Sequence, residues 1–225
     1  MRLWYRFILT IARVAYFVLW RPRYVGRQNL PDGPFLLCPN HRSWFDPPLM
    51  ALLVPREIGF LAKTELFKNC AFRWLIWSVN ARPIQRGGID RASVDHVLGI
   101  LQSGRPMLVF PEGTRSRSGQ MQPPRPGVGR LARLAAVPVV PVNITGSFHL
   151  GRVPFRWGRL IVTVGEPMSA QEALSYADDK SGYRALSQRI MRRICDLSDD
   201  PGRDWASSQT HSGHPEPDSP AAETL

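Results

Sequence analysis

The sequence of 225 residues predicts an α/β domain with a mostly parallel central sheet flanked by helices. Short apolar runs that are typical of strands recur along the chain from residue 23. Several of these runs alternate with segments of helical periodicity, a pattern that favours parallel strands joined by helices. The chain is also long enough for one well-buried domain, and its hydrophobic content of 44% is normal for a globular protein.

Seven runs have the length and apolar content of strands. They are RYVGR at 23–27, PFLLC at 34–38, EIGFLA at 57–62, RPIQR at 82–86, RPMLVF at 105–110, VPVVPVNI at 137–144 and RLIVTVG at 159–165. The run at 34–38 contains no charged residue, which indicates a buried strand.

Two segments have a clear helical period. The apolar positions of residues 89–103 share one helical face and are Val94, Val97, Leu98 and Leu101. A last helix at about 181–197 has a face made of Tyr183, Leu186, Ile190, Ile194 and Leu197. Residues 198–225 are rich in Ser, Pro, Asp and Glu and lack the aliphatic residues needed for a core. We therefore expect one folded domain at 23–197, a separate N-terminal helix within 1–22 and a disordered acidic tail at 198–225.

The charge of the chain indicates anionic partners. The formal net charge is +11, the sequence pI is about 10.5, and only three of the 29 basic residues are lysines. Nucleic acid, phosphorylated metabolites and anionic lipid are the candidate partners. The three cysteines are widely spaced and form no Cys-x-x-Cys pair. This spacing argues against a disulfide framework and a zinc site, and it favours a reducing compartment.

The most apolar segment is LWYRFILTIARVAYFVLW at 3–20. As a helix it would be roughly 27 Å long, just short of the hydrocarbon core of a bilayer, and its two internal arginines disfavour a spanning helix. Arg2, Arg6, Thr10 and Arg13 fall in one sector of a helical projection. We therefore expect a helix that lies in the membrane interface. The alternative is a core helix whose arginines extend to the surface.

A candidate catalytic pair lies in NHRSWFDPP at 40–48. His41 comes just after the buried strand, where α/β sheets place their ligand sites. Asp46, followed by two prolines, is typical of a helix N-cap. A short loop would also bring its carboxylate to the imidazole, which would fix the tautomer and leave Nε2 free as a base. We predict that Asp46 does both jobs; the alternative is a loop histidine beside a simple helix cap.

A candidate phosphate site lies in LVFPEGTRSRSG at 108–119. An apolar strand leads into a loop that contains Glu112, Gly113, Thr114 and Arg115. Arginine forks, hydroxyls and glycine-freed backbone amides together suit a phosphate group. Glu112 is the one acid between residues 105 and 133, which disfavours a merely solvated turn. In RPIQRGG at 82–88, Arg86 is a further candidate cation for this pocket.

Taken together, these blocks resemble the 1-acylglycerol-3-phosphate acyltransferase family, within the wider glycerolipid acyltransferases. NHRSWFD is similar to the family's Asn-His-x-x-x-x-Asp block, and VFPEGTRSRSG to its phosphate-binding block. Three less specific blocks also match, and they are AKTELF at 62–67, RPIQRGG at 82–88 and VPVVPVNITG at 137–146. The resemblance covers roughly residues 23–165. One departure is PPRPGVGR at 123–130, where Arg125 stands in a region that often carries a lysine.

The resemblance implies a glycerol-3-phosphate acyltransferase-like fold and a specific reaction. A fatty acyl group would move from acyl-CoA or acyl carrier protein to the free hydroxyl of lysophosphatidate, giving phosphatidate. His41 would remove the hydroxyl proton and Asp46 would orient His41. The phosphate would be held by Arg86, Gly113, Thr114 and Arg115, with Glu112 orienting the arginines or the acceptor. No acyl-enzyme, cofactor or metal is expected.

Several alternatives to this interpretation stay open. The acceptor could be another lysophospholipid or an aminolipid-derived molecule. A non-catalytic anionic-lipid-binding protein is disfavoured because both His41 and Asp46 are present. Nucleic-acid binding is disfavoured because the sequence has no recognition-helix or zinc-finger motif. Arginines interleaved with aromatic residues in 2–27 favour a peripheral, monotopic protein on the anionic cytoplasmic face of the cell membrane.

Overall fold

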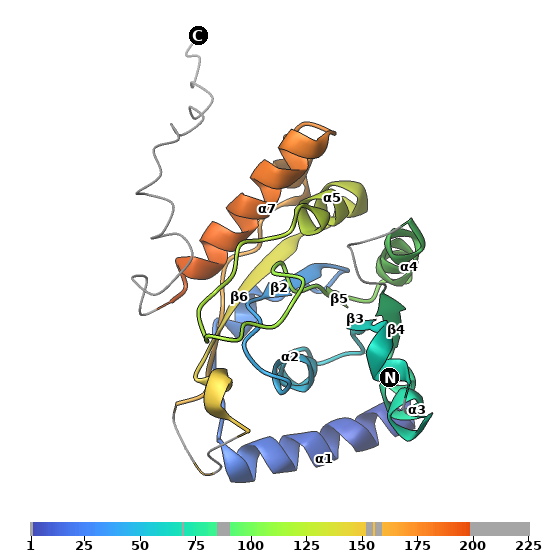
Figure 1. Ribbon diagram of the computed structural model, residues 1–225, viewed down its shortest axis with the longest axis vertical. Coiled ribbons are helices and arrows are strands. Elements are labelled where there is room, and N and C mark those ends of the chain that lie inside the picture. The colour runs from blue at the N-terminus through green and yellow to red at the C-terminus, as the bar shows by residue number, and fades with distance from the viewer. Residues whose placement is uncertain (1, 69, 85–90, 152–154, 156–158, 199–225) are drawn as a thin grey trace.

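The computed structural model describes residues 2–68, 70–84, 91–151, 155 and 159–198 (Figure 1). Within these residues one sheet has seven strands in the spatial order β1-β7-β6-β2-β5-β3-β4. The strands are β1 (Arg23–Val25), β2 (Leu36–Pro39), β3 (Gly59–Lys63), β4 (Ala81–Ile84), β5 (Met107–Leu108), β6 (Val139–Thr145) and β7 (Ile161–Val164). Neighbouring strands are parallel except β6 and β7, which are antiparallel. The predicted mostly parallel sheet is confirmed.

Helices cover both faces of the sheet (Figure 1). The α-helices of the described residues are α1 (Leu3–Leu19), α2 (Asp46–Leu53), α3 (Cys70–Ser78), α4 (Arg91–Gln102), α5 (Pro126–Ala135), α6 (Ala170–Leu174) and α7 (Lys180–Cys195). Short 3₁₀ turns are η1 (Arg27–Asn29), η2 (Thr64–Phe67) and η3 (Ser147–His149). The two helices predicted from periodicity, at 89–103 and about 181–197, correspond to α4 and α7.

The alternation of β2 side chains divides the core into two layers. Leu36 and Cys38 pack into the cluster that includes α4, α5 and α7. Phe35 and Leu37 pack on the other face, in the cluster that includes α1 and α2. Because both faces are covered, β2 is fully buried and its sequence is apolar at every position.

Close packing of α5 on α7 requires a glycine. A Cβ at Gly129 would lie 2.1 Å from the Tyr183 carbonyl oxygen. The backbone N–H of Gly129 also donates to Ser187 Oγ at 2.9 Å. This contact holds α5, and with it the residues that precede α5, against the body of the domain.

Parallel strands place the connecting loops at two opposite edges of the sheet. Residues 40–45 follow β2 and residues 109–125 follow β5, so both segments leave from the carboxyl edge. Glu57 precedes β3 and Arg105 precedes β5, so these residues lie at the amino edge. Ligand sites of open α/β sheets form at the carboxyl edge.

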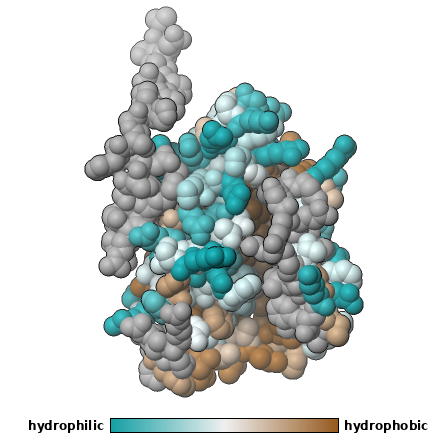
Figure 2. Space-filling view, in the orientation of Figure 1, coloured by the Kyte–Doolittle hydropathy of each residue, from teal (hydrophilic) through white to brown (hydrophobic). Residues whose placement is uncertain are grey.

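Helix α1 packs on the domain with one side and exposes apolar residues on the other. Tyr5, Leu9 and Tyr16 are buried against the body. The outward apolar residues are Leu3, Phe7, Ile11, Val14, Phe17 and Val18. In Figure 2 hydrophobic atoms gather at the lower end of the molecule, where Figure 1 places α1. Among the residues that the structure describes, no helix has the length and apolarity needed to cross a membrane.

Two predicted features fall outside the described residues. They are Arg86 and the acidic tail beyond Ser198.

Candidate active site

The loop after β2 is fixed at its start by a buried asparagine. Asn40 accepts a hydrogen bond from the Ile144 backbone N–H at 2.6 Å and donates one to the Ile144 carbonyl at 3.1 Å. Both bonds join the end of β2 to β6, its neighbour in the sheet. Asn40 is fully buried, so water does not compete for these bonds. His41, the next residue, therefore starts from a well-defined position at the carboxyl edge.

Asp46 brings the two ends of this loop together. Its Oδ2 accepts hydrogen bonds from His41 Nδ1 at 3.0 Å, from the Arg42 backbone N–H at 2.7 Å and from the Ser43 backbone N–H at 2.6 Å. The aspartate is fully buried, while the imidazole is partly exposed. A carboxylate only accepts, so Nδ1 carries the proton in this pair, and in the neutral imidazole Nε2 keeps its lone pair. This geometry suits a general base.

The predicted capping role of Asp46 is wrong. Helix α2 begins at Asp46 itself, and Phe45 is the N-cap residue. Pro47 and Pro48 follow and have no N–H groups that Asp46 could accept. The carboxylate accepts amides from the preceding loop instead, so the same oxygen orders the loop and orients His41.

Aromatic residues from two other elements support the same loop. The His41 ring stacks on Phe110, with ring centroids 3.9 Å apart and planes inclined by 21°. From α1, the Tyr16 hydroxyl donates to the Phe45 carbonyl at 2.5 Å. The ring of Trp20 contacts Phe45, with centroids 5.1 Å apart. The exposed N-terminal helix thus touches the backbone of the His41–Asp46 loop directly.

Glu112 connects the His41 loop with the loop after β5. Its Oε1 accepts the His41 backbone N–H at 2.7 Å, and its Oε2 accepts the Gln122 backbone N–H at 3.0 Å. The Ser116 backbone N–H donates to the His41 carbonyl at 2.9 Å. Glu112 is almost fully buried, and this burial raises its pKa to about 7 although both amide bonds favour the charged form. The carboxylate thus orders backbone, whereas the sequence predicts that it orients arginines or substrate.

Arg115 projects from the same loop toward the His41 loop. Its guanidinium carbon lies 4.4 Å from the centroid of the Trp44 ring. Gly113 has φ +65°, and a Cβ there would lie 3.2 Å from the side chain of Arg125. The Arg125 backbone N–H donates to the Pro111 carbonyl at 2.8 Å. The side chain of Arg125 therefore packs over Gly113 of the predicted phosphate site. Thr114, the next residue, is partly exposed.

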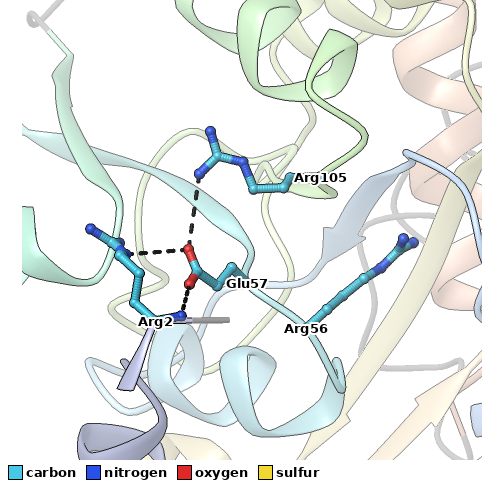
Figure 3. A pocket seen from close by; sticks show the side chains of 4 residues that line it. All are labelled: Arg2, Arg56, Glu57 and Arg105. Atoms are coloured by element: carbon cyan, nitrogen blue, oxygen red, sulfur yellow. Dashed lines mark hydrogen bonds and ion pairs between the residues drawn. The ribbon is translucent and has the colours of Figure 1, made fainter. Parts of the chain in front are cut away.

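A cavity of about 510 Å³ lies at the other edge of the sheet (Figure 3). It is lined by Arg2, Arg56, Glu57 and Arg105. Glu57 accepts the Arg2 backbone N–H at 2.6 Å and lies 3.5 Å from Arg2 Nε. The cavity is a charged joint between the start of α1 and the domain, and it contains no histidine. The presence of a cavity therefore does not by itself identify the catalytic site.

The structure brings together most of the predicted site residues. They lie at the carboxyl edge, on the loops after β2 and β5 and at the start of α2, and they are His41, Asp46, Glu112, Gly113, Thr114 and Arg115. Sequence reasoning missed the contributions of Asn40, Phe110, Trp44 and Tyr16. Asn40, Trp44 and Phe110 stand within the quoted motifs, which is the signal that could have found them, whereas Tyr16 has no local signal. No group of three His, Cys, Asp or Glu side chains suited to a metal ion occurs in the described part of the chain.

Comparisons with known proteins identify relatives of the chain. The chain is 25% identical over 195 residues to the 1-acyl-sn-glycerol-3-phosphate acyltransferase of Bacillus subtilis (strain 168), covering 86% of this chain and 96% of that protein. It is 29% identical over 176 residues to the Streptococcus pneumoniae enzyme of the same name, covering 77% of this chain and 64% of that protein.

A solved structure has the same fold. The crystal structure of the 1-acyl-sn-glycerophosphate (LPA) acyltransferase PlsC from Thermotoga maritima aligns with a TM-score of 0.66 and 26% sequence identity. The alignment covers 86% of this chain and 80% of the Thermotoga chain. A family model described as Acyltransferase matches residues 21–145, more than half of the chain. The chain belongs to the acyltransferase family.

Proposed function

We propose that this enzyme transfers a fatty acyl group to the free hydroxyl of 1-acyl-sn-glycerol-3-phosphate and produces phosphatidate. The observation that carries the proposal is the His41–Asp46 pair, 3.0 Å apart, beside an arginine-bearing loop suited to phosphate. The names of the Bacillus, Streptococcus and Thermotoga relatives support the same acceptor.

His41 acts as the general base in this proposal. Its Nε2 removes the proton from the acceptor hydroxyl, and the oxygen attacks the thioester carbonyl of acyl-CoA or acyl carrier protein. The Asp46 carboxylate stabilises the imidazolium that forms. When the tetrahedral intermediate collapses, the C–S bond breaks and the imidazolium returns its proton to the thiolate. General-base catalysis of this kind contributes about 10²–10⁴-fold to the rate.

The loop after β5 binds the acceptor phosphate in this proposal. Arg115 supplies a planar fork of N–H donors that matches phosphate oxygens. Gly113 and Thr114 add backbone and hydroxyl donors, and Arg86 remains a proposed second cation. Glu112 positions the backbone of the two loops and does not bind the phosphate, because both of its oxygens already accept backbone N–H groups. A buried carboxylate also repels a phosphate.

A substrate panel tests the proposed reaction. Purified protein is incubated with labelled acyl-CoA and, separately, with lysophosphatidate and lysophospholipids of larger headgroup, and the products are identified by mass. We expect phosphatidate from lysophosphatidate and little product from the others. Preferred acylation of a larger or aminolipid-derived headgroup would replace the proposed acceptor. Absence of acyl transfer to every acceptor, from acyl-CoA and from acyl carrier protein, would refute the proposed activity.

We also propose that the protein works at the anionic cytoplasmic leaflet, held there by α1. The support is the outward apolar side of α1, with the exposed Arg6, Thr10 and Arg13 along one flank. Apolar groups in the interface give a salt-resistant contribution, whereas basic residues contribute a salt-sensitive one. The lysolipid acceptor would reach the site from the bilayer, and the thioester donor would reach it from water.

Flotation with anionic liposomes tests this membrane proposal. Because α1 also carries buried Tyr5, Leu9 and Tyr16, deleting residues 1–20 risks unfolding. The double variant Phe7→Ser/Phe17→Ser changes only exposed positions and is the cleaner probe. We expect it to float poorly while keeping the wild-type melting temperature. Wild-type protein that stays with the soluble fraction at low salt would contradict the proposal.

A further inference from the structure

Trp44 occupies a position that the proposed mechanism does not explain. It lies inside the loop between His41 and Asp46, and 60% of its surface is exposed. Its ring faces the guanidinium of Arg115, which comes from the loop after β5. The stacked pair therefore joins the loop that holds the base to the loop that is suited to phosphate.

The geometry of the pair leaves Arg115 able to bind an anion. A guanidinium that stacks on an aromatic ring uses its flat face, whereas its N–H donors point outward in the guanidinium plane. Stacking also limits the freedom of a long and otherwise mobile side chain, so less entropy is lost when a phosphate binds. The ring thus holds the fork of Arg115 without occupying its donors.

The backbone around Trp44 makes it a firm support. On one side, the Ser43 N–H is held by Asp46, and on the other, the Phe45 carbonyl is held by the Tyr16 hydroxyl. A ring carried between these two fixed points sets the distance from the guanidinium to the imidazole. The distance between a phosphate on Arg115 and a hydroxyl at His41 is set in the same way.

We infer that Trp44 is a positioning residue that holds Arg115 in the orientation that receives the phosphate monoester of the acceptor. The inference rests on the proposed function, which names lysophosphatidate as the natural ligand. Recognition by Arg115 and Trp44 itself requires only a phosphate monoester. Trp44 thereby selects for acceptors with a small anionic headgroup and has no part in binding the acyl donor.

The test compares two tryptophans that stack on arginines. Trp44→Leu removes the ring from the Arg115 pair, and Trp44→Phe keeps an aromatic face. Trp77→Leu is the matched control, because Trp77 is also exposed and its ring lies 5.5 Å from the Arg82 guanidinium, near the start of β4 at the amino edge. For each variant, KM is measured separately for lysophosphatidate and for acyl-CoA in mixed micelles. Binding of glycerol 3-phosphate is measured by calorimetry, without turnover.

We expect Trp44→Leu to raise the KM for lysophosphatidate and the Kd for glycerol 3-phosphate by about 3- to 30-fold. This range is the change in affinity that corresponds to the loss of a cation–π interaction. The KM for acyl-CoA should stay unchanged, Trp44→Phe should recover most of the loss, and Trp77→Leu should resemble wild type. In an Arg115→Ala background, Trp44→Leu should have little additional effect, because the two residues act as one unit.

Three results would overturn the inference. They are an unchanged glycerol 3-phosphate affinity in Trp44→Leu, an equal rise in the KM of both substrates, and a loss confined to liposome flotation, which would make Trp44 a membrane contact. Failure of the proposed function gives a different result. In that case wild-type protein does not acylate lysophosphatidate, while the dependence of glycerol 3-phosphate binding on Trp44 is still measurable.

Discussion

At each of the two edges of the sheet, a carboxylate collects several hydrogen bonds and has a basic partner. At the carboxyl edge, Asp46 accepts two backbone N–H groups and the imidazole of His41. At the amino edge, Glu57 accepts the Arg2 backbone N–H and Asn80 Nδ2, and it pairs with Arg2 Nε. Partial burial opposes the charge of Glu57, but these bonds and the charge of Arg2 lower its pKa below the usual value.

The difference lies in the partners of the two carboxylates. His41 keeps a second ring nitrogen, Nε2, that is able to take up and release a proton, so the Asp46 pair is able to move a proton. Arginine does not release its proton in proteins, so the Glu57 cluster holds α1 in place and catalyses nothing. A cavity of about 510 Å³ lies at the amino edge (Figure 3), whereas the His41–Asp46 pair lies at the carboxyl edge.

The largest contrast is expected between the isosteric variants of these two carboxylates. Asp46→Asn should lower kcat by about 10²–10⁴-fold, because the neutral amide no longer stabilises the imidazolium. Glu57→Gln should leave kcat within about twofold and lower Tm by about 2–4 °C, as expected for a loss of about 1 kcal/mol from a partly exposed ion pair. Kinetics and thermal melts on both variants check this. A greater loss of kcat in Glu57→Gln than in Asp46→Asn would mean that the catalytic site lies at the amino edge and not at the carboxyl edge.

Arg115→Ala should lower kcat/KM for the acceptor more than kcat/KM for the acyl donor. A charge-assisted bond is worth roughly 1.5–3 kcal/mol, which corresponds to about 10- to 150-fold in kcat/KM for lysophosphatidate. Arg115→Lys should recover only part of this loss, because lysine lacks the planar fork. Equal losses toward donor and acceptor would instead indicate a general folding defect.

Two buried tyrosines at opposite ends of α1 give a finer comparison. Tyr16→Phe removes the bond to the Phe45 carbonyl and should lower kcat by about 3- to 10-fold, because small displacements of a catalytic loop are costly. Tyr5→Phe removes a contact with the Ile58 N–H at 3.5 Å, near the amino edge, and should lower Tm without lowering kcat. Equal kcat values for the two variants would show that α1 supports the loop by packing alone.

The last expected effect is on stability rather than on kcat, and it concerns Glu112 and pH. Its pKa in the folded protein, about 7, is above its ordinary value of 4.5, so the folded state binds the proton more tightly than the unfolded state. The resulting stabilisation is full below about pH 4.5 and is lost as the pH rises through about 7. Melting temperatures between pH 5 and pH 8 should therefore fall more steeply for wild type than for Glu112→Gln. Parallel slopes would mean that burial does not raise this pKa.

Local patterns predicted the sheet, α4, α7 and the His41–Asp46 pair, because each depends on residues close together in the chain. The spacing of His41 and Asp46 spans one strand end and one helix start, so a short loop was enough to join them. Helix α5 gave a weak pattern because Gly127 and Gly129 interrupt it, and Gly129 is needed for the approach to α7.

The contacts between loops could not be predicted in this way. The Trp44–Arg115 stack and the Glu112 bond to His41 join segments about 70 residues apart. They depend on β2 and β5 being neighbours in the sheet, which no local period encodes. The predicted capping role of Asp46 is wrong for a local reason: the prolines after Asp46 have no N–H groups, and its carboxylate accepts N–H groups of the preceding loop instead.

Turnover by His41→Ala tests the central claim most directly. The imidazole is partly exposed and its backbone bonds to Glu112 and Ser116 do not involve the side chain, so the variant should fold. With lysophosphatidate and acyl-CoA, we predict a loss of about 10²–10⁴-fold in kcat at an almost unchanged melting temperature. A folded His41→Ala enzyme that keeps near-wild-type turnover would contradict catalysis by the His41–Asp46 pair.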